Sequence, residues 1–193
     1  MLDNNESNLK HTLYDYFYYK SVYSQEQLKE LHKIFKENSI NSIDKAASGV
    51  IKTSNVTFVK WLFLRNYMYP IDQLILRHNQ KHIGYNIWPQ YDANDIMFNE
   101  YDSEKNGEYG WHKDHSNNYI CDLKLTVLIN VSLEKYEGGK FYIFTGNGEK
   151  HIPELDTPGN MVIFKSDQVH KVTPVTKGKR QSITLFYNGP RWL

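Results

Sequence analysis

The strongest constraint on the fold is the run of short segments that follows Tyr85. These segments alternate apolar with polar residues and are separated by Gly, Asn, Asp and Pro. Such alternation indicates half-buried strands, because successive side chains of a strand point to opposite faces of its sheet. We therefore expect strands over residues 95–101, 109–113, 123–133, 140–145, 159–164, 169–174 and 180–188. Several short strands at this spacing favour a sandwich or a barrel.

The first part of the chain has a helical pattern. Residues 24–38 open with a capping box of Ser24 and Gln27, and their apolar residues follow one helical face. Residues 57–80 also favour a helix, which we expect Pro70 to interrupt because proline disfavours helical angles at the residue before it. The prediction is an α+β fold of one domain, residues 1–193. Its helical part spans about residues 12–85 and packs on one sheet of a β part at about 86–190.

Composition argues against several partners. The 23 Lys and Arg nearly balance the 22 Asp and Glu, so the charge favours neither nucleic acid nor an anionic membrane. No apolar run approaches the roughly 18 residues that cross a bilayer. Residues 1–11 lack the basic-then-apolar order of a secretory signal, and a single cysteine, Cys121, excludes an internal disulfide framework. We expect a cytoplasmic protein without nucleic-acid or membrane partners.

Three residues have the spacing of a metal site. His112 and Asp114 lie two apart in "GWHKD", at the expected end of a strand, so their side chains should share one face. His170 follows in "QVHKV", near the start of another predicted strand. Two imidazoles and a carboxylate match the facial arrangement that holds non-haem Fe(II) and leaves positions open for other ligands. His115 is expected to point away from this face.

A basic residue opens the last predicted strand. Arg180 follows a turn at Gly178, and alternation places it on one face with Ser182, Thr184 and Phe186. A guanidinium beside hydroxyl groups suits a carboxylate ligand, because its fixed donors can engage both carboxylate oxygens. This face therefore predicts a carboxylate receptor.

The predicted strand 123–133 has one apolar and one partly polar face. The polar face carries Lys124, Thr126, Leu128, Asn130 and Ser132. Such a face fits either solvent or the lining of a small polar cavity, and alternation alone does not decide between them.

Together these motifs resemble a known family. From about residue 95 to 190 the chain is similar to the Fe(II)/2-oxoglutarate-dependent dioxygenases of the prolyl-4-hydroxylase-like group, above all its bacterial and phage branch of PKHD-type hydroxylases. The matching text is "EYDSEKNGEYGWHKD", "YEGGKFYIF" and "TPGNMVIFKSDQVHKVTPVTKGKR". The combination is specific because H-x-D, Y-[ED]-G-G, the P-G turn, H-x-V-x-P-V-x-x-G and the basic residue occur in this order.

The resemblance implies a double-stranded β-helix (jelly-roll) core and a set of roles. His112, Asp114 and His170 would bind Fe(II) and form the catalytic centre. Arg180 would bind the far carboxylate of 2-oxoglutarate. Three further residues would contribute to the cosubstrate site: Tyr101, Asn130 and Thr184. Dioxygen would be the second cosubstrate, and ascorbate a candidate reductant.

The implied activity is hydroxylation of a C–H bond, with release of succinate and carbon dioxide. A protein or peptide side chain such as proline is the substrate that the resemblance favours, and a free amino acid or another small molecule is the alternative within the same chemistry. A different class of function is a cupin-like metal-binding module without redox activity, or a zinc hydrolase. A hydrolase would need a carboxylate near the metal as general base and would not need Arg180 to face inward.

Overall fold

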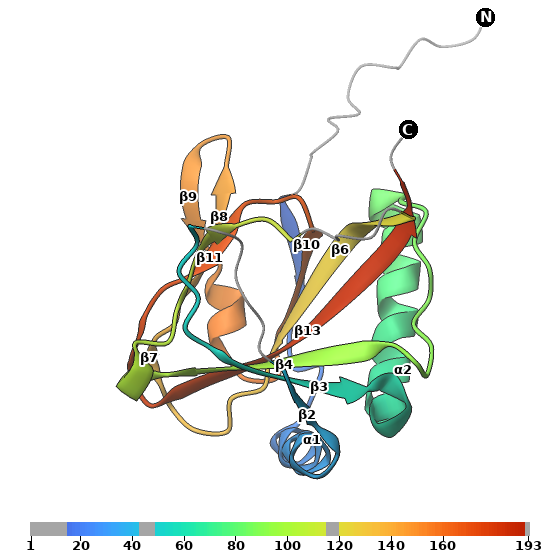
Figure 1. The fold of residues 1–193 in the computed structure, drawn as a ribbon. Helices are drawn as coiled ribbons and strands as arrows, with labels where there is room; N and C mark the ends of the chain where they lie inside the picture. The colour runs from blue at the N-terminus through green and yellow to red at the C-terminus, as the bar shows by residue number, and fades with distance from the viewer. Residues whose placement is uncertain (1–14, 43–48, 115–119, 192–193) are drawn as a thin grey trace, which may run out of the picture.

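Two layers of antiparallel strands face each other in the computed structural model, which describes residues 15–42, 49–114 and 120–191 (Figure 1). The strands of the large sheet are β1 (Tyr16–Tyr19), β2 (Ile40–Ser42), β3 (Asn55–Lys60), β4 (Asp95–Asp102), β6 (Cys121–Asn130), β10 (Met161–Lys165) and β13 (Lys179–Pro190). Their order across the sheet is β1-β10-β6-β13-β4-β3-β2. The long strand β13 lies in the middle, between β6 and β4.

The second layer is smaller. Its strands are β5 (Tyr109–His112), β8 (Phe141–Thr145), β9 (Gly148–His151) and β11 (His170–Val172), in the order β5-β11-β8-β9. A separate pair consists of β7 (Glu137–Gly138) and β12 (Val175–Lys177). Short helical turns are η1 (Asn79–Ile83), η2 (Ser103–Lys105) and η3 (Pro153–Asp156). This architecture confirms the predicted α+β class with a jelly-roll core.

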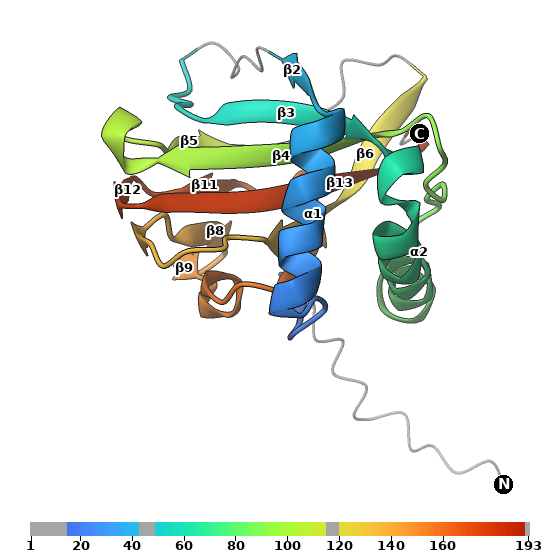
Figure 2. The same cartoon turned by 90° about the horizontal axis from the view of Figure 1, so that it is seen from below.

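The two long helices cover the outer face of the large sheet (Figure 2). Helix α1 (Gln25–Asn38) has the predicted capping box, in which the Gln27 N–H donates to Ser24 Oγ and the Ser24 N–H donates to Gln27 Oε1. Helix α2 (Trp61–His78) contacts α1 but runs in a different direction, because α1 is seen end-on in Figure 1 and α2 is not. No helix in the described ranges has the length and apolar character needed to cross a membrane.

Two predictions for the first part of the chain were wrong. Residues 55–60 form strand β3, which pairs with β4, and β1 and β2 also lie within the stretch expected to be helical. Pro70 does not interrupt α2, because the apolar stripe of Leu64, Met68 and Ile71 continues past it and is buried against the sheet. Tertiary packing here outweighs the local preferences of Pro70 and its neighbour.

The alternation along β6 separates two hydrophobic cores. Its odd-numbered residues, such as Leu125 and Val127, pack under the helices, whereas Leu128 belongs to a second core between the two sheets. The partly polar face of this strand therefore points into the interior of the double layer. This answers the question that alternation left open, because Thr126 and Asn130 on that face are fully buried.

Candidate metal and cosubstrate site

The three predicted ligands meet at one end of the small sheet. His112 ends β5, His170 begins β11, and the two residues lie opposite each other in this antiparallel pair. Asp114 follows in the loop after β5, and not on the strand as expected; its N–H donates to the Ser166 carbonyl at 2.9 Å. One ligand atom from each of the three side chains lies within 4.8 Å of the other two.

Both imidazoles present an unprotonated Nε2 to this centre. Each Nδ1 lies 2.8 Å from a backbone carbonyl oxygen, of Gly110 for His112 and of Gln168 for His170. Because a carbonyl only accepts hydrogen bonds, Nδ1 carries the proton in both rings. The pKa of each imidazole is lowered to about 4, chiefly by burial and for His112 also by the neighbouring His170. Both rings are therefore neutral at pH 7.

This arrangement fits a metal ion. The Nε2 atoms lie 3.7 Å and 3.6 Å from the Asp114 carboxylate, and in these neutral tautomers none of these atoms can donate a hydrogen bond to another. The lone pairs of the two Nε2 atoms and of the carboxylate oxygens point toward one another with no proton between them, and a bound cation stabilises such an arrangement. Two neutral imidazoles and one carboxylate are the donors that Fe(II) takes in facial sites.

Thr126 orients the carboxylate and was not identified from the sequence. Its hydroxyl donates to Asp114 Oδ2 at 2.7 Å and lies 3.0 Å from the hydroxyl of Ser166. The available signal was its position on the partly polar face of the predicted strand 123–133. Such outer hydrogen bonds fix the direction of a metal ligand.

Arg180 is a buried cation in the same cavity. It is 1% exposed, its Nη1 donates to Ser182 Oγ at 3.3 Å, and its Nη2 has no hydrogen-bond partner in the described part of the chain. Its Cζ lies 5.4 Å from the ring centroid of Tyr101. A buried guanidinium with an unused donor fits an anionic group supplied by a ligand.

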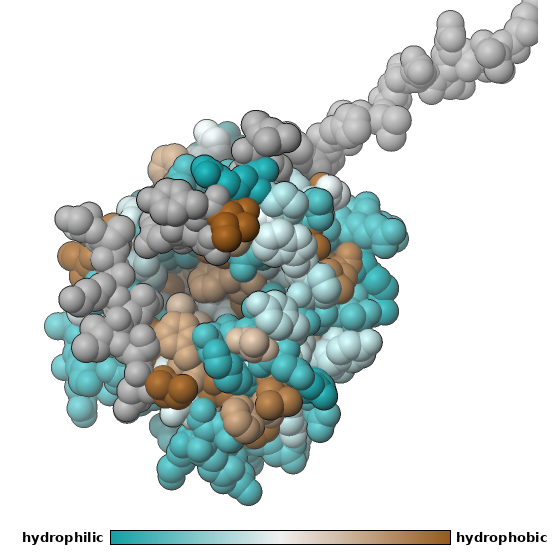
Figure 3. Space-filling view, turned by 45° about the vertical axis from the view of Figure 1, so that its right-hand side comes forward, coloured by the Kyte–Doolittle hydropathy of each residue, from teal (hydrophilic) through white to brown (hydrophobic). Residues whose placement is uncertain are grey.

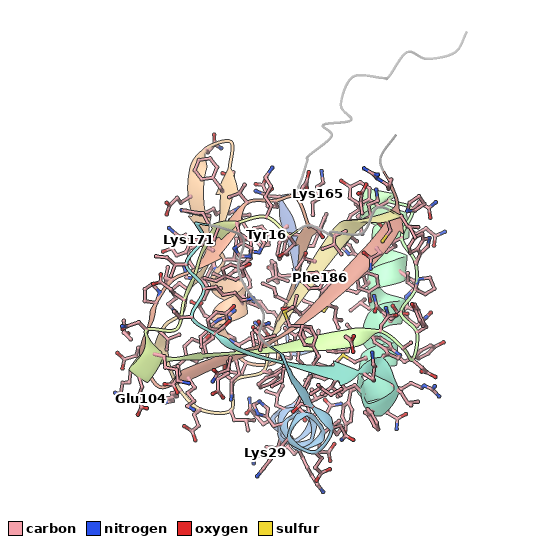
Figure 4. The ribbon with its side chains drawn as sticks, in the orientation of Figure 1. Tyr16, Lys29, Glu104, Lys165, Lys171 and Phe186 are labelled. Carbon is pink, nitrogen blue, oxygen red and sulfur yellow. The ribbon has the colours of Figure 1, made fainter. Side chains whose placement is uncertain are left out.

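A single cavity of about 620 Å³ connects the triad with Arg180. Figure 3 shows a hollow in the surface of the molecule, with hydrophobic residues in its depth. Tyr101 and Thr184 also line the cavity, and their contact with the cosubstrate stays a prediction. So does Phe186, which Figure 4 marks on β13.

Asn130 lies outside this lining. Its amide donates to the Tyr136 hydroxyl and to the Leu155 carbonyl, and its Oδ1 accepts from the Ser132 N–H. These bonds favour a structural role, in which Asn130 joins β6 to η3. A cosubstrate contact of Asn130 stays a prediction. His115 lies outside the described residues.

Two further residues that line the cavity, Tyr109 and Lys52, were not identified from the sequence. The ring of Tyr109 stacks on His112, with centroids 3.4 Å apart, and the ammonium of Lys52 lies 4.6 Å from the Tyr109 centroid. Burial lowers the pKa of Lys52 to about 8. No motif pointed to Lys52, because it comes long before the segment that contains His112.

Comparison with known proteins gives three kinds of similarity. The profile of the 2OG-Fe(II) oxygenase superfamily matches residues 96–188. A PKHD-type hydroxylase of Aliarcobacter butzleri is 30% identical over 170 residues, which cover 82% of this chain and 72% of that protein. Matches to the first curated relatives, also PKHD-type hydroxylases, span only 38% to 41% of their length.

Solved structures share the fold. A prolyl-4-hydroxylase of Pseudomonas putida superposes with a TM-score of 0.69 at 17% identity, covering 92% of this chain and 94% of that one. A prolyl hydroxylase of Trichoplax adhaerens, in complex with a peptide fragment of the hypoxia inducible factor oxygen degradation domain, has a TM-score of 0.66 at 18% identity. That match covers 90% of this chain and 83% of the other. Both confirm the double-stranded β-helix.

Proposed function

Because this chain belongs to the PKHD-type hydroxylases of the 2OG-Fe(II) oxygenase superfamily, we propose that it hydroxylates a peptide side chain at the expense of 2-oxoglutarate and dioxygen. In this proposal His112, Asp114 and His170 bind Fe(II), and Arg180 holds the far carboxylate of 2-oxoglutarate. A single domain over residues 1–193 and a cytoplasmic location are part of the same proposal.

One observation supports this function above the others. Two unprotonated Nε2 atoms and a carboxylate converge at one point of a cavity, and a buried guanidinium with an unused donor lines the same cavity. A metal site alone accounts for the first half of this arrangement. The second half calls for a ligand that carries a carboxylate, and 2-oxoglutarate is such a ligand.

In this chemistry the protein itself would bind the metal, orient the cosubstrate and limit the access of water. Bound Fe(II) supplies the activation of dioxygen that couples oxidation of 2-oxoglutarate to succinate and carbon dioxide with oxygen insertion into a C–H bond. His112, Asp114 and His170 would leave coordination positions open on one side. Arg180 would orient the cosubstrate by its carboxylate, and the apolar walls of the cavity would limit water around the reacting groups.

The size of the cavity supports a peptide substrate. A volume of about 620 Å³ exceeds what a five-carbon diacid fills, so room remains for part of a second molecule. The prolyl hydroxylase of Trichoplax adhaerens binds a peptide in the same fold. We therefore propose a peptide side chain, with proline as the first candidate, and a free amino acid as the alternative.

The hydrolase alternative lacks a general base. Within the described residues, the one acid besides Asp114 that lines the cavity is Asp95, which forms an ion pair with Lys60 at 2.7 Å. A carboxylate held in this way is poorly suited to activate a metal-bound water. The buried Arg180 would also have no task in a hydrolase.

The proposal is tested by turnover of 2-oxoglutarate. Purified protein with Fe(II), 2-oxoglutarate and ascorbate should form succinate slowly, and Asp114→Ala should abolish this formation. A candidate peptide should increase the rate and gain 16 Da. Wild-type protein that consumes no 2-oxoglutarate with any peptide, but binds Zn(II) tightly, would move the hydrolase alternative ahead.

A further inference from the structure

We propose that an apolar subsite beside the metal ligands selects peptides that carry a large apolar residue within about three residues of the hydroxylated one. Four side chains of the large sheet form this subsite, and we call them the apolar floor: Phe58, Met97, Leu123 and Phe186. The inference rests on the proposed function, because it assigns the class of peptide that the same cavity accepts.

The apolar floor lies on the face of the large sheet that points into the cavity. Met97 of β4 lies opposite Phe58 of β3 on one side and opposite Thr184 of β13 on the other. Side chains of residues that lie opposite each other in paired strands share one face, and Phe186 shares the face of Thr184 because it follows two residues later. The floor residues thus line the same cavity as the metal ligands.

A register shift adds Leu123 to the apolar floor. Tyr187 of β13 lies opposite Leu125 of β6, whereas the next residue, Asn188, lies opposite Leu123, so β6 has one extra residue at this point. Such a bulge changes the direction of the side chains beyond it. Strict alternation would place Leu123 with Leu125 under the helices, but Leu123 lines the cavity.

The apolar floor begins beside the metal ligands. Phe186 lies opposite Thr126, whose hydroxyl donates to Asp114 at 2.7 Å. Arg180 precedes Phe186 by six residues on the same strand, which is about 20 Å of extended chain and longer than a five-carbon diacid. A 2-oxoglutarate molecule held by Arg180 therefore leaves the part of the cavity over the apolar floor to the substrate.

The small sheet does not extend over this part of the large sheet. Figure 1 shows β4, β6 and β13 reaching past β8 and β11 toward α2, and Figure 4 marks Phe186 on that stretch of β13. All four side chains of the apolar floor are half-buried. Apolar surface that stays accessible inside an active-site cavity is surface that a ligand can cover.

Carboxamide side chains next to the apolar floor fit a peptide backbone. Asn188 lies opposite Leu123, and Gln90 donates through Nε2 to the Phe186 carbonyl at 2.9 Å; both line the cavity. The Gln90 N–H donates to the buried carboxylate of Asp72 at 3.3 Å, which holds this residue in place. Because carboxamides can both donate and accept hydrogen bonds, they suit the N–H and C=O groups of an extended peptide.

The width of the apolar floor sets how far along the peptide the apolar residue can lie. Strand β6, which carries Thr126, is separated from β3 by β13 and β4, so the distance across these strands is about 14 Å. An extended peptide advances about 10 Å over three residues, and a large side chain adds to this reach. Apolar side chains up to three residues from the hydroxylated one can therefore contact the floor.

Phe144 provides a matched control. It is also an accessible phenylalanine on a strand, 51% exposed, but it belongs to β8 and is not among the residues that line the cavity. Its ring packs edge-on against Trp111, with centroids 5.9 Å apart. Loss of an apolar side chain from the surface can therefore be separated from loss of one from the cavity.

Binding without turnover tests the inference. The full chain is loaded with redox-inactive Zn(II) and 2-oxoglutarate, and fluorescence anisotropy measures labelled serine peptides with one central proline. In further peptides a single phenylalanine replaces serine at each position from three before to three after the proline. We expect phenylalanine in at least one position to tighten binding about tenfold. This advantage should persist in high salt, because it does not depend on charge.

Variants assign the preference to the apolar floor. Met97→Gln and Leu123→Asn nearly keep the size of each side chain but make it polar, so the advantage of the phenylalanine peptide should fall to about threefold or less in each. Met97→Leu and Phe144→Gln should keep the advantage of wild type. Thermal melting of each variant shows that it is folded.

Three results would overturn the inference. The first is equal binding of the phenylalanine and serine peptides by wild type. The second is an advantage that survives both polar substitutions in the floor, and the third is an equal loss in Phe144→Gln. N-acetylphenylalaninamide that competes as well as the best peptide would make the ligand a small apolar molecule and overturn the assignment to peptides.

The outcomes also separate this inference from the proposed function. Succinate formation from 2-oxoglutarate without any preference for apolar peptides leaves the hydroxylase proposal intact and removes the role of the apolar floor. Protein that never consumes 2-oxoglutarate overturns the proposed function and with it this inference.

Discussion

Gly139 packs directly against the side chain of Arg180. A Cβ atom added to Gly139 would lie 2.9 Å from Arg180 Cδ, which is closer than such contacts occur. Gly139 has a φ of +58°, and its N–H donates to the Pro174 carbonyl at 2.9 Å. The turn before β8 therefore contacts the buried methylene groups of the Arg180 side chain and so helps to set the position of the guanidinium in the cavity.

Gly139→Ala should displace Arg180. The added methyl group clashes with Cδ, and a left-handed backbone angle strains alanine by about 1–3 kcal/mol. We expect the KM for 2-oxoglutarate to rise roughly three- to tenfold in the succinate assay, with a lower melting temperature. Gly146→Ala is the control, because nothing lies within 4 Å of its added Cβ and no positive φ is found there. Equal effects of the two substitutions would contradict this account.

Arg180→Gln should weaken 2-oxoglutarate much more than Fe(II). Removal of a charge-assisted contact to a carboxylate costs about 1.5–3 kcal/mol, or roughly 10- to 100-fold in the KM for 2-oxoglutarate. The neighbouring Lys179 forms ion pairs with Glu100 and Asp102 at the surface, so Lys179→Gln should leave this KM near wild type. Titration of both ligands by succinate formation measures the difference. A larger loss for Fe(II) than for 2-oxoglutarate would speak against Arg180 as the carboxylate receptor.

Thr126→Val should loosen the metal site without removing a ligand. The substitution keeps the shape of the side chain but deletes the hydroxyl that donates to Asp114 at 2.7 Å. Loss of such an outer hydrogen bond typically lowers metal affinity about 10- to 100-fold. Thr126→Ser keeps the hydroxyl and should restore most of the affinity for Co(II), followed by its visible absorption. Weak binding by both variants would indicate a packing effect instead.

Metal binding should resist mild acid. Imidazoles must be neutral to bind a metal, and burial lowers the pKa of His112 and His170 from 6.5 to about 4. Both rings therefore stay neutral as the pH falls from 7 to 5.5 and become protonated only near pH 4. Two unshifted histidines would weaken metal binding about 100-fold at pH 5.5. Calorimetric titration with Co(II) at pH 7 and 5.5 should show a far smaller change.

The three candidate metal ligands could be identified from the sequence because their signal is local. His112 and Asp114 lie two apart, and His170 and Arg180 occur in one continuous motif with its turns. The jelly-roll strands were likewise visible in their alternation. Strand β3 was missed because residues 57–60 continue into an apolar helix without a break, and short apolar runs do not distinguish strand from helix.

Other parts of the site depend on contacts between distant segments. Lys52 reaches the cavity only because its segment pairs with β5, and Thr126 meets Asp114 only because β6 and the loop after β5 converge. The hydrogen bond from the Asn130 amide to the Leu155 carbonyl likewise joins β6 to a separate segment, η3. Such contacts have no fixed spacing along the chain, so no motif announces them.

The strand β1 has a consequence for any shortened form of this protein. Strand β1 pairs with β10, with Tyr16 opposite Phe164 and Tyr19 opposite Met161. It is an edge strand of the large sheet. A protein that lacks residues 1–20 would lose β1, and the backbone amide and carbonyl groups on that side of the apolar strand β10 would be left without hydrogen-bond partners. Strands exposed in this way recruit one another between molecules, so the truncated protein should self-associate and precipitate rather than merely lose stability.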